Sequence, residues 1–103
     1  MSDSGTYRTL GEFYPSYLSE HSNRTCRRLH FVGTSVALAL LIAAVLTRNG
    51  WLVLAGLVQG YAFAWAGHFF FEHNKPATFK HPWLSFLGDW RMWWEILSGR
   101  IRF

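Results

Sequence analysis

The sequence predicts an all-α membrane protein, in which two transmembrane helices form a hairpin and an amphipathic interfacial helix lies at each end. Its 103 residues suit one small domain. Half of them are hydrophobic and 18% are aromatic, which excludes a disordered chain. Charged residues make up 16%, whereas a soluble domain carries about 25%. Two long apolar stretches with flanking basic residues complete the prediction, and the one cysteine excludes a disulfide framework.

The two apolar stretches set the expected transmembrane helices at residues 24–47 and 51–73. Residues 31–46 contain no charged side chain, and apolar residues also dominate the second stretch. A helix of about 20 residues, rising about 1.5 Å per residue, spans a hydrocarbon core of about 30 Å. The polar link 47–50 ends in Asn-Gly and is so short that the two helices are expected to run antiparallel.

Basic residues lie outside the two apolar stretches rather than together in one patch. Four arginines precede the first stretch, five basic residues follow the second, and the link holds Arg48 alone. By the positive-inside rule we expect both termini in the cytoplasm and the protein in a bacterial inner membrane. The net charge of +4 then favours anionic lipid headgroups over nucleic acid as the partner.

Amphipathic segments are expected at both ends of the hairpin. In the N-terminal segment 1–22, aromatic and apolar residues recur at helical spacing. In the C-terminal segment 82–98, Pro82 suits the first turn of a helix, and tryptophans gather on one face, while Asp89 and Glu95 fall largely elsewhere. Because tryptophan favours the headgroup region, we expect both segments to lie at the membrane interface.

Two histidines carry the strongest signal of a functional site. His30 in the first apolar stretch and His68 in the second lie nearly the same number of residues from the link, so the hairpin sets them at one depth, at the cytoplasmic edge. Small residues share their helix faces, which allows the helices to approach closely. Glu72 follows His68 by four residues on the same face. Two imidazoles and one carboxylate suit non-haem Fe(II), but the histidines equally suit interhelical hydrogen bonds.

Other candidate residues carry weaker signals. His21 falls on the aromatic face of the N-terminal segment, and His73 points away from the expected site. His81 directly precedes the last expected helix and is a candidate cap for it. Cys26 is interpreted as a buried small residue, because no base is evident beside it.

Two motifs occur in a fixed order along the chain. The first joins an aromatic residue, two histidines and an asparagine: Tyr17, His21, Asn23 and His30. The second is the run GHFFFE at 67–72, followed by Pro76 and Ala77. Together they resemble the signatures of the Fe(II)-dependent 2-hydroxy fatty acid dioxygenases, a family of small membrane proteins of fatty acid α-oxidation. The resemblance covers residues 13–90.

The resemblance implies an iron enzyme that removes one carbon from a 2-hydroxy acyl chain, with Fe(II) as cofactor and O₂ as second substrate. At the matching positions the metal ligands would be His21, His30 and His68, with Glu72 as a catalytic partner. For binding the substrate carboxylate at the interface, the sequence offers three basic residues: Arg24, Arg28 and Lys75. The acyl tail would lie along the hairpin within the lipid bilayer, and a homo-oligomer could close a tunnel around it.

Two points stay open at the level of the sequence. If the first transmembrane helix begins at Asn23, His21 lies about two turns, or about 10 Å, from the level of His30, unless the N-terminal segment folds back. The histidines also fit two other functions: a non-enzymatic membrane scaffold or assembly protein, and a b-type haem carrier in which histidines of two spans ligate the haem. The sequence does not select the metal, the acyl chain length or the oligomeric state.

Overall fold

The computed structural model describes residues 7–76 and 79–103, and over these residues it contains helices and turns but no strand. The elements are α1 (Leu10–Ser19), α2 (Arg24–Thr47), α3 (Trp51–Ala66), the π-helix η1 (Gly67–Glu72) and α4 (Pro82–Leu97). Because η1 continues α3 without a break, the described chain forms four helices, and the expected all-α class is confirmed. Residues 1–6 of the expected N-terminal segment and Ala77 of the second motif lie outside the described residues.

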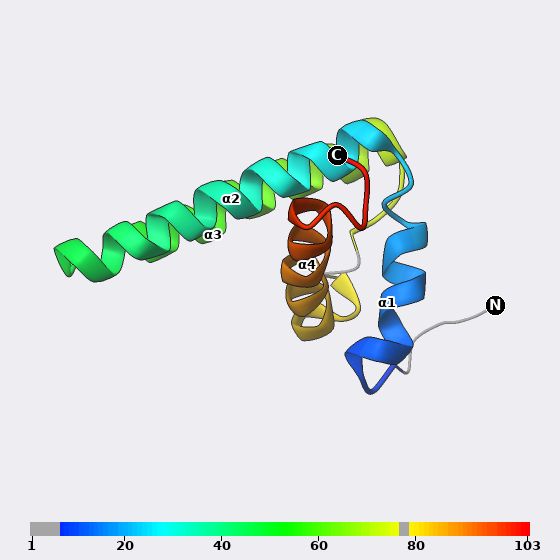
Figure 1. The fold of residues 1–103 in the computed structure, drawn as a ribbon, viewed down its shortest axis with the longest axis horizontal. Helices are drawn as coiled ribbons and strands as arrows, with labels where there is room; N and C mark the ends of the chain where they lie inside the picture. Colours follow the sequence, from blue (N-terminus) through cyan, green and yellow to red (C-terminus); the bar gives the residue numbers. More distant parts are fainter. Residues whose placement is uncertain (1–6, 77–78) are drawn as a thin grey trace.

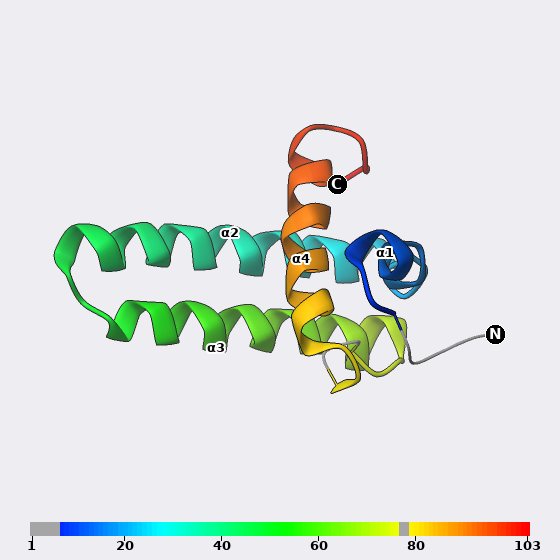
Figure 2. The ribbon, with the colours of Figure 1, turned by 90° about the horizontal axis from the view of Figure 1, so that it is seen from below.

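α2 and α3 lie side by side and antiparallel, as a long hairpin (Figures 1 and 2). Two segments, Arg24–Thr47 and Trp51–Glu72, are long and apolar enough to cross a membrane. Arg48, in the left-handed region with a φ of 56°, ends α2. The side-chain oxygen of Asn49 then accepts a hydrogen bond from the Trp51 amide at 3.1 Å, which starts α3.

α1 and α4 lie next to each other on one side of the hairpin (Figure 1). Their shared core consists of five buried side chains: Phe13, Tyr14, Tyr17, Met92 and Ile96. Gly88 lets α4 approach α1, since a Cβ added there would lie 3.1 Å from Tyr17 Cδ2. Trp93 Nε1 donates to Ser35 Oγ at 2.9 Å, which ties α4 to α2. Part of the tryptophan-rich helix is therefore used within the protein, and an interfacial position of α1 and α4 stays a prediction.

The half of the hairpin that carries the link, residues 40–58, extends away from α1 and α4 (Figures 1 and 2). We call it the distal half. Most of its large apolar side chains are exposed, with exposed fractions of 70% for Val45, 79% for Leu46, 77% for Trp51 and 62% for Val58. Soluble proteins rarely leave so large an apolar surface in water. The distal half therefore suits contact with lipid tails.

Candidate metal centre

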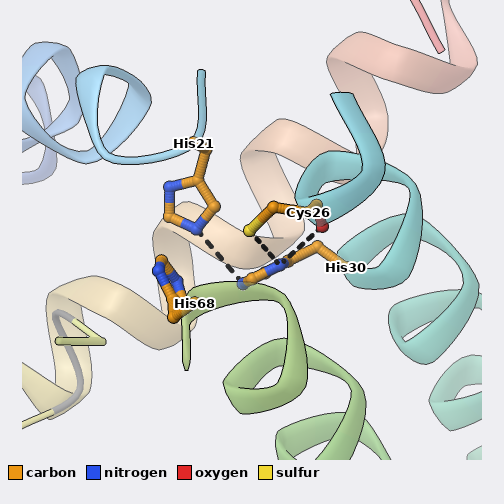
Figure 3. A group of neighbouring side chains, drawn as sticks. All are labelled: His21, Cys26, His30 and His68. Carbon is orange, nitrogen blue, oxygen red and sulfur yellow. Dashed lines mark hydrogen bonds between the residues drawn. The ribbon is translucent and has the colours of Figure 1, made fainter. Parts of the chain in front are cut away.

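Three histidines and one cysteine meet near the end of the hairpin opposite the link, which we call the inner end, beside the first turns of α2 and η1 (Figure 3). Their ligand atoms all lie within 4.8 Å of one another, and all four residues are buried: His21, Cys26, His30 and His68. They come from three segments, which are the connection between α1 and α2, the first two turns of α2, and η1. The rings of His30 and His68, expected at one depth, have centroids 5.1 Å apart.

A reversal of the chain after α1 brings His21 to His30. The helix α2 begins directly after Asn23, so an extended connection would leave His21 far from His30. The chain instead folds back, and the Nε2 atoms of the two histidines lie 3.1 Å apart. Arg27 holds the reversal, because its Nη1 donates to the backbone carbonyl oxygen of His21 at 3.0 Å.

Each of these two imidazoles is held through its Nδ1. His21 Nδ1 donates to the backbone carbonyl oxygen of Tyr17 at 2.6 Å, and the Tyr17 ring stacks on the imidazole with centroids 4.1 Å apart. His30 Nδ1 donates to the backbone carbonyl oxygen of Cys26 at 3.1 Å. Because a carbonyl oxygen only accepts hydrogen bonds, the proton of each neutral ring sits on Nδ1, and Nε2 keeps its lone pair.

The third imidazole is held in the same way by a side-chain amide. His68 Nδ1 donates to Asn74 Oδ1 at 2.6 Å. The amide nitrogen of Asn74 donates to the Glu20 carbonyl oxygen at 3.2 Å, which sets the orientation of the amide. Histidines that bind metals are typically fixed through their second nitrogen in this manner. The Nε2 atoms of all three histidines are thus available as ligands.

The π-helix η1 brings His68 into the cluster. Such helices concentrate at functional sites. Gly67 at its start allows a close approach to α2, because an added Cβ would lie 2.8 Å from Cys26 Sγ and 3.2 Å from Cys26 Cα. At its end the backbone N–H of Asn74 donates to the His68 carbonyl oxygen at 3.0 Å. Both contacts fix the backbone position from which the His68 side chain enters the cluster.

The tautomers leave His21 and His30 with two lone pairs that face each other. No proton lies between the two Nε2 atoms at 3.1 Å, so their contact is unfavourable unless a cation binds both. Burial lowers the pKa of His21 well below its usual value, and the neighbouring His30 and His68 act in the same direction. His21 is therefore neutral at pH 7, which is the form that binds metals.

The donor set fits a first-row transition metal. Metal–nitrogen bonds of about 2.1 Å place two ligands of one ion roughly 3 to 4 Å apart, and the ligand atoms here lie within 4.8 Å of one another. Neutral imidazole suits iron, zinc and copper. Three imidazoles also leave coordination positions open for other molecules, which is what a catalytic site requires.

Cys26 belongs to this cluster, which the sequence interpretation missed. Its side chain is fully buried, as expected, but its Sγ lies 3.8 Å from His30 Nδ1. The four-residue spacing from Cys26 to His30 on one helix face was the available signal. The sulfur lies beside the Nδ1 edge of the His30 ring, whereas the Nε2 edge faces His21 (Figure 3).

Glu72, the expected catalytic carboxylate, is not a member of the four-residue cluster. It accepts hydrogen bonds from the backbone amide of Asn23 and from Ser22 Oγ, the latter at 3.4 Å. A carboxylate at a helix N-terminus is favourable, because it faces the positive end of the helix dipole. In this position Glu72 joins the end of η1 to the start of α2.

The remaining expected site residues lie around the inner end without entering the cluster. Arg24 and Arg28 both donate from Nε to the backbone oxygen of Phe103, at 3.0 and 3.1 Å. Lys75 and His73 are exposed. His81 occupies the N-cap position of α4, but its side chain makes no capping hydrogen bond to the helix. Its ring packs against the rings of Tyr7 and Phe13, and the centroid distance is 5.3 Å in both cases.

Asp89 of α4 lies beside the cluster, although the sequence placed it away from the aromatic face. Its Oδ1 is 3.9 Å from His30 Nε2 and accepts a hydrogen bond from the Tyr17 hydroxyl. Burial raises the pKa of Asp89 to about 7, while the hydrogen bond from Tyr17 acts in the opposite direction. An acidic residue within a helix rich in tryptophan was the only signal in the sequence.

A mainly apolar pocket begins at His30 and Asp89 and follows the hairpin towards the link. Counting its open mouth, its empty volume is about 420 Å³. Beyond His30 and Asp89, its lining comes from α2, α3 and α4: Thr34, Ala37, Gly56, Leu57, Gly60, Tyr61, Ala64, Phe86 and Trp90. The pocket therefore joins the histidine cluster to a surface that suits an aliphatic chain.

Comparisons with known proteins give one match. No curated protein and no solved structure shows significant similarity to the chain. Residues 7–101 match the family described as 2-hydroxy-palmitic acid dioxygenase Mpo1-like, which agrees with the resemblance carried by the two motifs. Since the match extends over nearly the whole sequence, the chain belongs to the Mpo1-like family.

Proposed function

We propose that the protein is an Fe(II)-dependent dioxygenase that shortens 2-hydroxy fatty acids by one carbon. The family description supports the reaction class. The observation that carries the proposal for this chain is the set of three Nε2 atoms from His21, His30 and His68, each on a ring fixed through Nδ1. These histidines would hold the iron, which when bound supplies the redox chemistry with O₂.

The residues around the cluster would bind and position the substrate. The apolar pocket that starts at His30 would take the acyl tail. Arg24, Arg28 and Lys75 lie near the same end and would attract the carboxylate from the membrane surface. Glu72 would act by holding α2 against η1, so that His30 and His68 keep their relative positions.

The membrane supplies the substrate in this proposal. With both termini in the cytoplasm of a bacterium and the distal half within the inner membrane, the pocket would open towards the lipid tails. A fatty acid could then enter sideways from the bilayer without crossing water. A second copy of the chain could cover the open side of the pocket.

A haem carrier fits the cluster less well. Two histidines that ligate one haem lie on opposite faces of the porphyrin, but the rings of His30 and His68, the histidines of the two spans, have centroids 5.1 Å apart, which leaves no space for a porphyrin between them. The non-enzymatic scaffold remains the alternative that the activity assay tests.

The test is an assay of anaerobically purified protein loaded with Fe(II). On addition of O₂ and 2-hydroxypalmitate, we expect O₂ consumption and release of the acid with one carbon fewer. Palmitate should not be cleaved, and Zn(II) in place of Fe(II) should abolish turnover because zinc does not change its oxidation state. If iron-loaded, folded protein gives no shortened acid from 2-hydroxy acids of several chain lengths, the scaffold function is correct instead.

A further inference from the structure

We propose that Asp89 recognises the 2-hydroxyl group of the substrate by accepting its hydrogen bond, and so selects 2-hydroxy acids over plain fatty acids. This inference rests on the proposed function and names a specificity-determining residue for it. It assigns to α4 a direct part in substrate binding, beside its packing against α1.

The position of Asp89 supports this role. It lines the inner end of the pocket together with His30, and its neighbours on α4 in the lining, Phe86 and Trp90, are aromatic. If the head of the acid lies at the histidines and its tail follows the pocket, the first carbons of the acid therefore lie beside Asp89. The 2-hydroxyl is carried by one of these carbons.

The hydrogen bonds of Asp89 leave it with free capacity. A carboxyl group keeps acceptor capacity in either protonation state, and Tyr17 is the one donor to Asp89 among the residues that the structure describes. His30 Nε2 lies 3.9 Å away, which is too far for a hydrogen bond, and the proton of that ring is on Nδ1. The Asp89 side chain is 17% exposed, so a substrate that covers it without supplying a donor would remove its remaining acceptor capacity from water at a cost in free energy.

The chemistry of the substrate identifies that donor. At pH 7 the substrate carboxylate only accepts hydrogen bonds, and the acyl tail neither donates nor accepts them. The 2-hydroxyl is the one donor that a 2-hydroxy fatty acid offers near its head. A plain fatty acid would cover the Asp89 carboxylate without adding a donor to that of Tyr17, and sites built around such a bond reject the analogue that lacks it.

A second tyrosine–carboxylate pair between the same helices shows what is particular to Asp89. Tyr14 donates to Glu95 at 2.6 Å, as Tyr17 donates to Asp89. Glu95, however, also pairs with Arg91 at 3.5 Å and does not line the pocket. The Glu95 carboxylate therefore has its partners within the protein, whereas Asp89 faces the place of the substrate.

The experiment compares binding of 2-hydroxypalmitate and palmitate to anaerobic, Fe(II)-loaded protein, in which no turnover occurs. Dissociation constants of both acids are measured for the wild type, Asp89→Leu, Asp89→Asn and the control Glu95→Gln, with the iron content of each. Because the substrate hydroxyl would lose its acceptor, Asp89→Leu should reduce the preference for the hydroxy acid by about 10- to 100-fold. Asp89→Asn, which keeps an acceptor oxygen, should show an intermediate loss, and Glu95→Gln should keep the wild-type preference.

The outcomes separate the two proposals. If the wild type prefers the hydroxy acid and both Asp89 variants keep that preference with full iron, the role of Asp89 is wrong and the proposed function stands. A loss of iron in Asp89→Asn would make Asp89 a metal ligand and overturn the inference. If the wild type binds neither acid, the proposed function fails and the role of Asp89 fails with it.

Discussion

The two ends of the hairpin differ in what surrounds them. In the distal half the side chains of Leu46 and Trp51 are 79% and 77% exposed, and α1 and α4 do not reach them (Figure 1). At the inner end His21, His30 and His68 are 1%, 4% and 2% exposed, beneath contacts from every helix. One helix pair thus carries a surface suited to lipid and, at its other end, an enclosed polar cluster.

The hairpin alone therefore does not make the site. The distal half depends on hydropathy, because its surface requires only that the side chains be apolar. The inner end depends on bonds between segments far apart in sequence: Tyr17 with Asp89, Ser22 and Asn23 with Glu72, and Asn74 with Glu20. Substitutions at the two ends should therefore have very different effects.

The largest effect is expected from removing two ligands together. Removal of a residue that only hydrogen-bonds to a metal ligand typically lowers the metal affinity by about 10–100-fold. Loss of two ligands should lower it further, so the double variant His30→Ala/His68→Ala should purify without bound iron. Metal analysis of protein extracted from the membrane measures this, and membrane insertion should persist because the distal half is unchanged. The control is His73→Ala, an exposed histidine just beyond η1 that should leave the iron content intact. Full metal content in the double variant would show that the cluster is not the metal site.

A smaller effect is expected where η1 meets α2. In Gly67→Ala the new Cβ would lie 2.8 Å from Cys26 Sγ, and overpacking of this kind costs about 1–3 kcal/mol in the free energy of unfolding. Because η1 carries His68, the metal affinity should fall as well. The matched control is Gly60→Ala on the same helix pair, where the nearest atom to the new Cβ is 3.9 Å away. Thermal unfolding and metal titration measure the stability and the metal affinity of both variants. Equal stability and equal metal affinity of the two variants would contradict the close packing at Gly67.

Much of the fold could be predicted from the sequence, because its signals are local. The all-α class follows from apolar stretches of helical length. The link also acts locally, since Arg48 and Asn49 end one helix and start the next within a few residues. The packing of α1 on α4 could not be predicted, because a face rich in aromatic residues suits a lipid interface and a protein core equally.

The candidate site could be predicted only in part. His30 and His68 were found because an antiparallel hairpin equates their depth. The approach of His21 depends on a chain reversal held by Arg27, which no periodicity reveals. Asp89 arrives on a separate helix, so its distance from His30 depends on how α4 crosses the hairpin.

The smallest effect is expected in the distal half. Leu→Ala at a buried core position costs about 2–5 kcal/mol, yet Leu46→Ala should change the free energy of unfolding by less than about 0.5 kcal/mol. The reason is that the proposed position in the membrane would place Leu46 against lipid or detergent in the folded state; lipid tails are as apolar as leucine, so little would be lost when the side chain is shortened. Thermal unfolding in detergent micelles, with iron content as a second readout, measures this. A loss above about 1 kcal/mol would mean that Leu46 is buried against protein, and since the described chain leaves it exposed, that protein would be a second copy covering the distal half.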